Sequence, residues 1–408
     1  MFISKDNFNT NFMLVILFFF FFPYKYFEHY AVKSLIIFFT PLFFLFYKNW
    51  KINKKDLFIL FFIFANIISY LTNIRFEKLS IDYSLYRLLI LLNIFFIYKI
   101  FDYLLIETKF SLDKIMNFVV VVLLIFVFLE NIIGLLLHSF AWVNEDNILT
   151  YQLEKLNFEF FLNYSSAILN LSYIFPVSYF LLNWTELDEK KKIFILCYLL
   201  LVLLSLLLVF SRLSIFIFFL NIILIICINF IKFKRINFIA IIWPILFLLF
   251  LILLNYLFFE ISIKNHVSHS IKHRIQLVEN YLFLIKDFNL EELFFGKGIG
   301  WINHEYILNK KDHILGFSTH NLIISIFIET GFLGLFSMIT LLSKLLLDVH
   351  SFKLIGKKKK IKIGFYLLFL NFIILNLFHS DLMRMLIPFS IMLIYYSITK
   401  NLYYQNIK

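Results

Sequence analysis

The sequence has 408 residues, of which 62% are hydrophobic, 21% aromatic and only 16% charged, and its formal net charge is +12. Soluble globular domains carry about 25% charged residues, so this chain has too few charges to cover a water-facing surface. Most lysines lie in short segments between apolar runs, where basic residues set membrane topology and do not indicate nucleic-acid binding. The composition therefore excludes a soluble globular protein and predicts membrane lipids as its surroundings.

Apolar runs that approach or exceed the length needed to cross a membrane recur from one end of the chain to the other. We expect an all-α fold, in which residues 1–408 form a single integral membrane domain, a polytopic transmembrane bundle of about twelve spans. The expected spans are residues 11–22, 31–47, 57–72, 85–106, 115–137, 164–184, 193–210, 213–231, 237–258, 319–343, 363–379 and 385–399.

Basic connections between the runs predict the orientation of the bundle. Four are strongly basic: Lys48 to Lys55, Lys190 to Lys192, Lys232 to Arg235, and Lys353 to Lys362. With twelve spans and the N-terminus inside, all four lie in the cytoplasm, as basic connections do in membrane proteins. Both termini are then expected in the cytoplasm. The first run lacks a small-residue cleavage site after it, so we expect it to be retained as a span.

The longest polar segment, residues 259–318, is expected on the outer side between the ninth and tenth spans. Its apolar residues at spacings of three and four predict one face of an amphipathic helix; they are Ile271, Ile275, Val278, Leu282 and Ile285. Such a helix either lies along the membrane surface or caps the bundle. Gly296, Gly298 and Gly300 follow it, and alternate glycines let the backbone bend closely around another group. No strand precedes them, which disfavours a phosphate loop.

Arginine is scarce, with six residues against 32 lysines, and five of the six are expected on or near the outer side. These five are Arg75, Arg87, Arg212, Arg274 and Arg384. The planar guanidinium binds phosphate through paired hydrogen bonds and stays charged when partly desolvated. Arg212 and Arg274 are the main candidates for such a role, whereas Arg75 and Arg384 taken singly fit side chains that reach lipid head groups.

His320 is a candidate general base, because it stands at the expected membrane entrance of the tenth span, and imidazole titrates near the working pH. The alternative is a structural histidine at a helix start. Nine residues after Asn321 come Gly331 and then Gly334. Glycines three apart lie on one helix face and allow close helix packing.

The run from His320-Asn321 through nine residues to Gly331-x-x-Gly334 resembles the signature of the O-antigen ligase family. That signature is His followed by Asn, Ser or Gln, nine residues, and Gly-x-x-Gly-x-x-Gly. Ser337 replaces the third glycine here. The Ser-Arg turn at residues 211–212, and an arginine followed by Gly-x-Gly in the outer loop, are also similar to the family, so the resemblance covers residues 205–340.

The resemblance implies a glycosyltransferase of the bacterial inner membrane that moves a glycan from undecaprenyl diphosphate to a lipid A–core acceptor on the periplasmic face. By position, His320 would activate the acceptor hydroxyl, and Arg212 and Arg274 would hold the diphosphate. We expect Arg87 and Asn321 to bind substrate as well. A repeat-unit polymerase of the same superfamily, with a glycan acceptor, is the alternative.

A transporter of lipid-linked oligosaccharide is the non-enzymatic alternative, which the smoothly apolar spans and the absence of a repeat disfavour. We expect neither metal nor cofactor. The first outer loop offers only Glu28 in place of the paired acids with which many membrane glycosyltransferases hold a cation. The acidic pairs at residues 145–146 and 291–292 fit solvated loop charges.

Overall fold

The structure is a computed structural model, and it describes residues 56–74, 81–107, 112–141, 173–208, 212–233, 266–302, 321–354, 357–379 and 382–407. Within these residues all regular secondary structure is helical, which confirms the predicted all-α class. The expected spans 11–22, 31–47 and 237–258 lie outside the described residues. The count of twelve spans and the single-domain assignment therefore stay predictions.

The helices follow the apolar runs of the sequence. They are α3 (Asp56–Ile74), α4 (Ile81–Glu107), α5 (Leu112–Ala141), Tyr173–Leu182, α8 (Glu189–Leu208), α9 (Arg212–Phe233), α11 (His266–Lys286), α12 (Leu290–Phe295), α14 (Leu322–Ser351), α15 (Lys357–His379) and α16 (Leu382–Ile407), with a short 3₁₀ turn at Trp184–Glu186. Among the described residues, two segments are long and apolar enough to cross a membrane by length and composition, Asp56–Asn73 and Leu322–Ser351.

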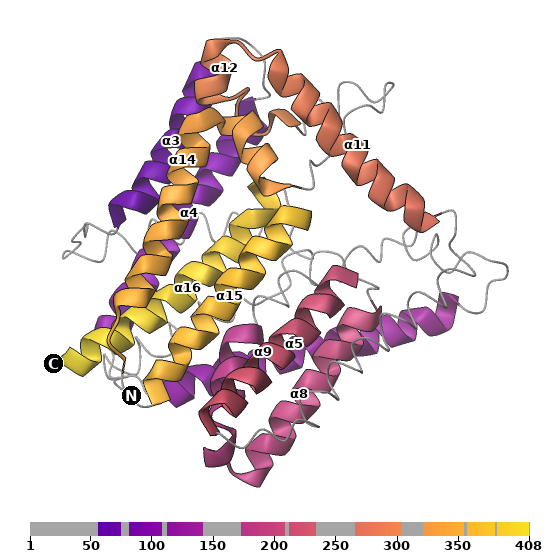
Figure 1. The fold of residues 1–408 in the computed structure, drawn as a ribbon, viewed down its shortest axis with the longest axis vertical. Helices are drawn as coiled ribbons and strands as arrows, with labels where there is room; N and C mark the ends of the chain where they lie inside the picture. The colour runs from indigo at the N-terminus through magenta and orange to yellow at the C-terminus, as the bar shows by residue number, and fades with distance from the viewer. Residues whose placement is uncertain are drawn as a thin grey trace, which may run out of the picture.

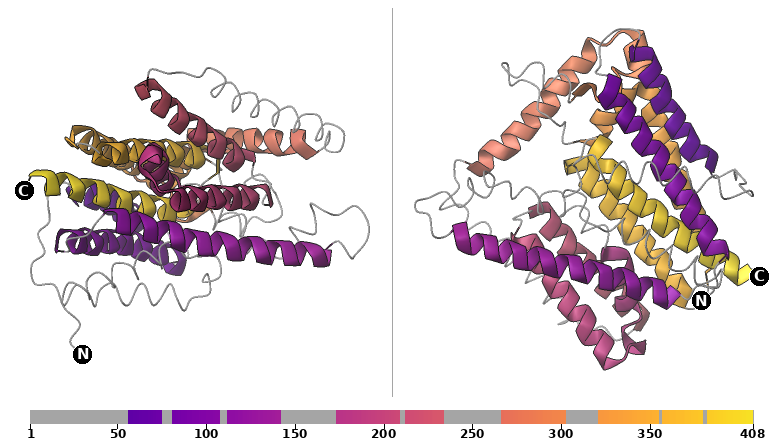
Figure 2. Two further views of the ribbon diagram at one scale, coloured as in Figure 1. Left: turned by 90° about the horizontal axis from the view of Figure 1, so that it is seen from below. Right: turned by 180° about the vertical axis from the view of Figure 1, so that it is seen from behind.

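Two groups of helices share one hydrophobic core. In the first group α3 packs against α14 and α4, and α16 packs against α4, α15 and α14. In the second group α8 packs against α5 and α9, and α9 also contacts α15, which joins the groups. Figures 1 and 2 show α12 beside the ends of α3 and α14, and α11 running from there along one side of the molecule.

Two basic segments that we expected as connections are instead the first turns of helices. Lys190–Lys192 lies in α8, and Lys357–Lys360 lies in α15. Lysine is a good helix former when its ammonium group can reach water. Asp188 starts α8, because its Oδ1 accepts a hydrogen bond from the Lys191 backbone N–H at 2.8 Å. The helices therefore begin several residues before the apolar runs do.

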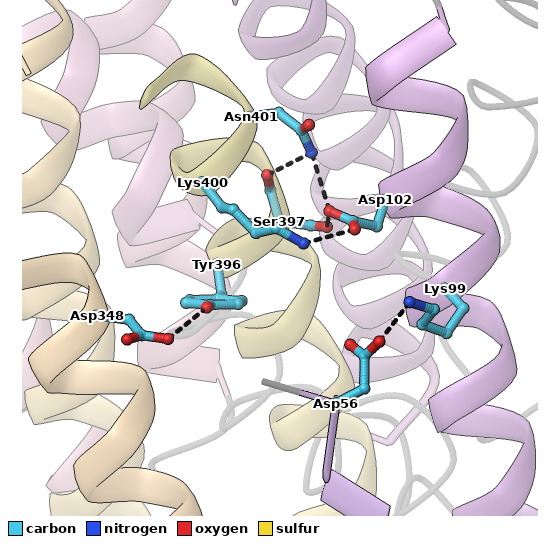
Figure 3. A network of polar contacts seen from close by, with 8 residues as sticks. All are labelled: Asp56, Lys99, Asp102, Asp348, Tyr396, Ser397, Lys400 and Asn401. Carbon is cyan, nitrogen blue, oxygen red and sulfur yellow. Dashed lines mark hydrogen bonds and ion pairs between the residues drawn. The ribbon is translucent and has the colours of Figure 1, made fainter. Parts of the chain in front are cut away.

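Buried charged and polar side chains join the helices at the end of the bundle that holds the C-terminus of α16 (Figure 3). We call this group the charged cluster, and it consists of Asp56, Lys99, Asp102, Asp348, Tyr396, Ser397, Lys400 and Asn401. Lys99 pairs with Asp56 between α4 and α3. The Tyr396 hydroxyl donates to Asp348 at 3.0 Å between α16 and α14. The cluster thus connects four helices.

Asp102 of α4 is the centre of this cluster. Its carboxylate accepts hydrogen bonds from Ser397 at 2.7 Å, Lys400 at 2.6 Å and Asn401 at 3.0 Å, all on α16. Lys400 and Asp102 are both buried, and a buried ion is stable only when its partner and further hydrogen bonds compensate for the lost water. The three donors supply that compensation and fix α16 against α4.

Candidate active site

The turn after α12 is built on glycines at the opposite end of α3 from the charged cluster. We call residues 296–300 the α12 turn. Gly296, Gly298 and Gly300 have φ angles of 73°, 103° and 89°, values that side chains disfavour and glycine allows. Asn289 starts α12 with a capping box in which its side chain accepts from the Glu292 N–H at 2.8 Å. The local sequence thus places a short helix and a strongly bent turn in succession.

Helix α14 is broken at Gly331, where φ is 64° and ψ is −163° (Figure 1). The sequence predicted that Gly331 and Gly334 lie on one face of a helix and allow close packing. Another segment does pack closely at Gly331, but the helix is not continuous there. We call the nine residues before the break, Leu322–Thr330, the short arm of α14. The atoms nearest to a Cβ on Gly334 would belong to the side chain of Thr330, one turn earlier in the same helix.

The α12 turn packs backbone to backbone against the break. A Cβ on Gly296 would lie 2.4 Å from the carbonyl carbon of Glu329, and a Cβ on Gly331 would lie 2.4 Å from that of Phe294. Both distances are too short for any side chain. Each segment therefore leaves room for the other only because both positions are glycine.

Hydrogen bonds from the α12 turn satisfy the carbonyl groups that the break exposes. A helix end leaves its last carbonyls without donors from the same helix. Here the N–H of Lys297 donates to Ile328 O at 2.7 Å, and the N–H of Gly298 donates to Glu329 O at 3.0 Å. The break is therefore a satisfied junction between two segments.

Helix α3 contacts both sides of this junction. The Ser69 hydroxyl donates to Glu329 O at 2.6 Å, and Asn73 Nδ2 donates to Gly296 O at 3.2 Å. Both side chains are buried. The side chain of Ile299, from the α12 turn, fills the space between α3 and α4, where it packs against Tyr70 and Leu88.

Helix α11 covers the short arm from the other side. Tyr281 packs in a small cluster with Trp301 of the loop and with Ile324 and Ile328 of the arm. Lys297 lies over the rings of Trp301 at 4.9 Å and Phe288 at 5.1 Å, and its Nζ lies 3.7 Å from a carboxylate oxygen of the partly exposed Glu292. These contacts fit the alternative in which the amphipathic helix caps the bundle.

The buried face of α11 agrees with the predicted one only in part: Val278 and Ile285 pack against this cluster as expected. Leu277 and Tyr281 are buried, whereas Leu282, which we placed on the apolar face, is 49% exposed. The tyrosine ring fills the space beside the short arm, so the helix turns that residue inward. Ile271 and Ile275 have side chains outside the described part.

The predicted substrate-binding arginines lie in helices, and only their backbone positions are described. Arg87 directly precedes Leu88, which packs on Ile299, so its position in α4 is next to the α12 turn. Arg274 lies one turn before Leu277 in α11. Arg212 is the first residue of α9, which packs against α8 and α15. Of the three, Arg87 is the one whose chain neighbour contacts the α12 turn.

Asn321 begins the short arm, and its predecessor His320 lies outside the described residues. The Asn321 side-chain oxygen accepts hydrogen bonds from the N–H groups of Ile323 at 3.0 Å and Ile324 at 3.2 Å. This oxygen caps the helix, a use that we did not assign to Asn321. The roles of His320, Asn321 and the arginines in substrate binding and catalysis stay predictions.

Ser69, Asn73 and Glu329 are residues of this junction that sequence reasoning missed. Asn66, Ser69 and Asn73 recur at spacings of three and four along an otherwise apolar span, and a polar stripe at helical spacing indicates contacts with other segments. Glu329 is an acidic residue within an expected span, which is a functional signal by itself; it is 1% exposed. These patterns were visible in the sequence.

In the ranges that the structure describes, no three His, Cys, Asp or Glu side chains are grouped so that they could hold a metal ion. The two cysteines, Cys197 and Cys227, are unpaired thiols. The metal-independent chemistry expected from the outer arginines stays a prediction.

Comparison with known protein families gives a match for part of the chain. Residues 197–339 match the family model described as O-Antigen ligase. The matched range begins in α8 and ends in α14, so it includes Arg212, Arg274, the α12 turn and the whole short arm with its break. No curated protein matches the chain. Over these residues the chain is thus similar to the O-antigen ligase family.

Proposed function

We propose that the protein is a membrane glycosyltransferase that moves a glycan from undecaprenyl diphosphate to a lipid A–core acceptor. The observation that carries this proposal is the family match over residues 197–339, which implies a glycosyltransferase-like membrane enzyme with lipid-linked glycan substrates. The α12 turn and the short arm lie inside that range. On this proposal, their end of the bundle faces the periplasm, and the charged cluster lies toward the cytoplasm of an inner-membrane protein.

The reaction that we propose needs a base and a stabiliser for the leaving group. His320 takes the proton of the acceptor hydroxyl, whose oxygen forms the new bond to the anomeric carbon. The bond between that carbon and the diphosphate oxygen breaks, and the lipid diphosphate leaves with the electron pair. Arg212 and Arg274, with Arg87, bind the diphosphate and neutralise its growing charge. No metal ion takes part.

The arrangement of the short arm supports the role of its N-terminal end. A catalytic group must be held in one geometry for proton transfer to be efficient. Asn321 caps the arm, the cluster around Tyr281 covers it, and the junction at Gly331 fixes its other end. The residue before Asn321 therefore directly precedes a helix segment that is held at both ends.

Reconstituted transfer tests the proposal. Protein in vesicles receives an undecaprenyl-diphosphate-linked oligosaccharide together with lipid A–core, or with a second lipid-linked oligosaccharide alone. We expect glycosylated lipid A–core from the first mixture. We expect no elongated oligosaccharide from the second. Chain extension in the second mixture would make the protein a polymerase. No product in either mixture, with folded protein, would contradict glycan transfer. His320→Ala serves as the inactive control.

A further inference from the structure

The side chains of Ser69 and Asn73 on α3 donate hydrogen bonds to backbone carbonyls of segments far away in the chain. Each residue binds one side of the same junction, Ser69 the carbonyl of Glu329 and Asn73 the carbonyl of Gly296. Ser69 and Glu329 are 260 residues apart in the chain. Two side chains one helical turn apart on α3 thus contact both the broken helix and the turn that fills the break.

We propose that Ser69 and Asn73 are positioning residues, which set the angle of the short arm and thereby the place of the residue that precedes Asn321. This inference rests on the proposed function, because it assigns the reacting base to that end of the arm. Neither residue needs to touch substrate. Their effect passes through the backbone of Glu329 and Gly296.

The Glu329 carbonyl shows why this role differs from simple stabilisation. It accepts hydrogen bonds from both Ser69 Oγ and the Gly298 N–H. Removing the hydroxyl therefore leaves the buried carbonyl with one donor, and no orphaned polar group results. The fold should tolerate that loss. Of these two bonds, however, the lost one is the bond that connects the arm to α3.

The length of the arm amplifies small changes at the break. Nine helical residues span about 14 Å, so a tilt of about 10° at Gly331 moves the far end by about 2 Å. A displacement of about 1 Å in catalytic geometry can lower the rate by about 100-fold. The spacing of nine residues between Asn321 and Gly331 equals the length of the arm, and this gives that spacing a physical meaning.

Turnover measurements on Ser69→Ala and Asn73→Ala test the inference against matched variants. Ser69→Thr keeps a hydroxyl at the same position. Thr340→Ala removes a hydroxyl that bonds only within α14, to Phe336 O at 2.8 Å and Ser337 O at 2.9 Å. We expect kcat to fall about 10- to 100-fold in the two alanine variants, with the KM for the donor nearly unchanged in both and the thermal midpoint nearly unchanged in Ser69→Ala. Ser69→Thr should recover most of kcat, and Thr340→Ala should keep it.

A distance measurement gives a readout that does not depend on activity. Spin labels on cysteines at the exposed positions 323 and 339, in a background with Cys197→Ser and Cys227→Ser, lie on opposite sides of the break. We expect Ser69→Ala to shift or broaden the distance distribution, and Thr340→Ala to leave it unchanged.

The outcomes separate this inference from the proposed function. If folded Ser69→Ala keeps full kcat or an unchanged distance distribution, the positioning role is overturned. An inactive His320→Ala would then leave the proposed function standing. Full activity of His320→Ala overturns the proposed base, and the positioning role of Ser69 and Asn73 in catalysis is lost with it. In Ser69→Ala the thermal midpoint could fall in step with kcat, with no recovery in Ser69→Thr. That result also overturns the inference, because it assigns Ser69 to stability alone.

Discussion

The two ends of α3 are held by different kinds of contact. At its N-terminal end Asp56 belongs to the charged cluster, in which side chains of different helices pair with one another. At its C-terminal end Ser69 and Asn73 bind backbone carbonyls of a broken helix and a glycine turn. The first arrangement joins whole helices and resists their separation. The second sets the direction of one short segment.

This difference predicts two classes of variant. Changes in the charged cluster should lower the amount of folded protein and leave the turnover of each folded molecule nearly intact. At the junction, removal of the Ser69 hydroxyl should lower turnover at similar stability, whereas a side chain that strains the backbone, or loss of the Lys297 contacts, should lower stability. The predictions below follow the expected size of the effect.

Asp102→Asn should give the largest loss of stability. It leaves buried Lys400 without its counter-ion, and removal of one partner from a buried pair costs about 3–5 kcal/mol. The thermal midpoint of the detergent-purified protein and its level in the membrane should both fall. Asp102→Asn combined with Lys400→Met should recover much of the loss. Glu189→Gln, which removes an exposed pair with Lys192, is the control and should change little. A wild-type midpoint for Asp102→Asn would contradict the role of the cluster.

Gly331→Ala should lower both stability and turnover. A side chain at its positive φ costs about 1–3 kcal/mol, and the new Cβ would meet backbone of Phe294, which cannot rotate away. Gly364→Ala is the matched control, because its Cβ would meet the Ser178 side-chain oxygen, which can move. If both variants kept equal transfer rates and thermal midpoints, the close contact between the break and the α12 turn would be wrong.

Lys297→Ala should have a moderate effect. It removes two ring contacts and the ion pair with Glu292, together about 1 kcal/mol. The thermal midpoint should fall by a few degrees. Lys286→Ala removes a contact with Phe283, which is 65% exposed, and should leave the midpoint unchanged. Equal midpoints for the two variants would show that the ring contacts of Lys297 contribute nothing.

Removal of divalent metal should have no effect on transfer. On the proposed mechanism, arginines neutralise the leaving diphosphate, so purified protein should keep its rate in excess EDTA. A loss of rate that Mg²⁺ or Mn²⁺ restores would contradict the arginine mechanism. As a control, the thermal midpoint is measured in the same concentration of EDTA. This distinguishes damage to the fold from loss of a catalytic ion.

The sequence predicted the described helices well, because long apolar runs are a strong signal. It did not predict the break at Gly331, since Gly-x-x-Gly is also the pattern of a regular packing face. The break exists because the α12 turn, more than thirty residues earlier, supplies hydrogen bonds to the exposed carbonyls.

In the candidate site, too, contacts between distant segments could not be predicted. The glycines and Asn321 were singled out from local pattern. The structure places Gly296, Gly298 and Gly331 at one junction, and Asn321 at the other end of the short arm. Ser69 and Asn73 come from α3, far away in the chain, and no local pattern links them to Glu329 or Gly296. Long-range contacts of this kind depend on how helices pack, which spacing within one helix does not reveal.

Donor affinity and turnover in His320→Ala test the central claim most directly. A general base contributes about 10²–10⁴ in rate, so we predict a loss of turnover in that range with the donor Kd nearly unchanged. Arg212→Ala is the comparison, and it should weaken donor binding as well as turnover. Protein level and thermal midpoint must match the wild type in both. A loss of donor affinity in folded His320→Ala as large as that in Arg212→Ala would make His320 a diphosphate ligand and contradict its role as the base.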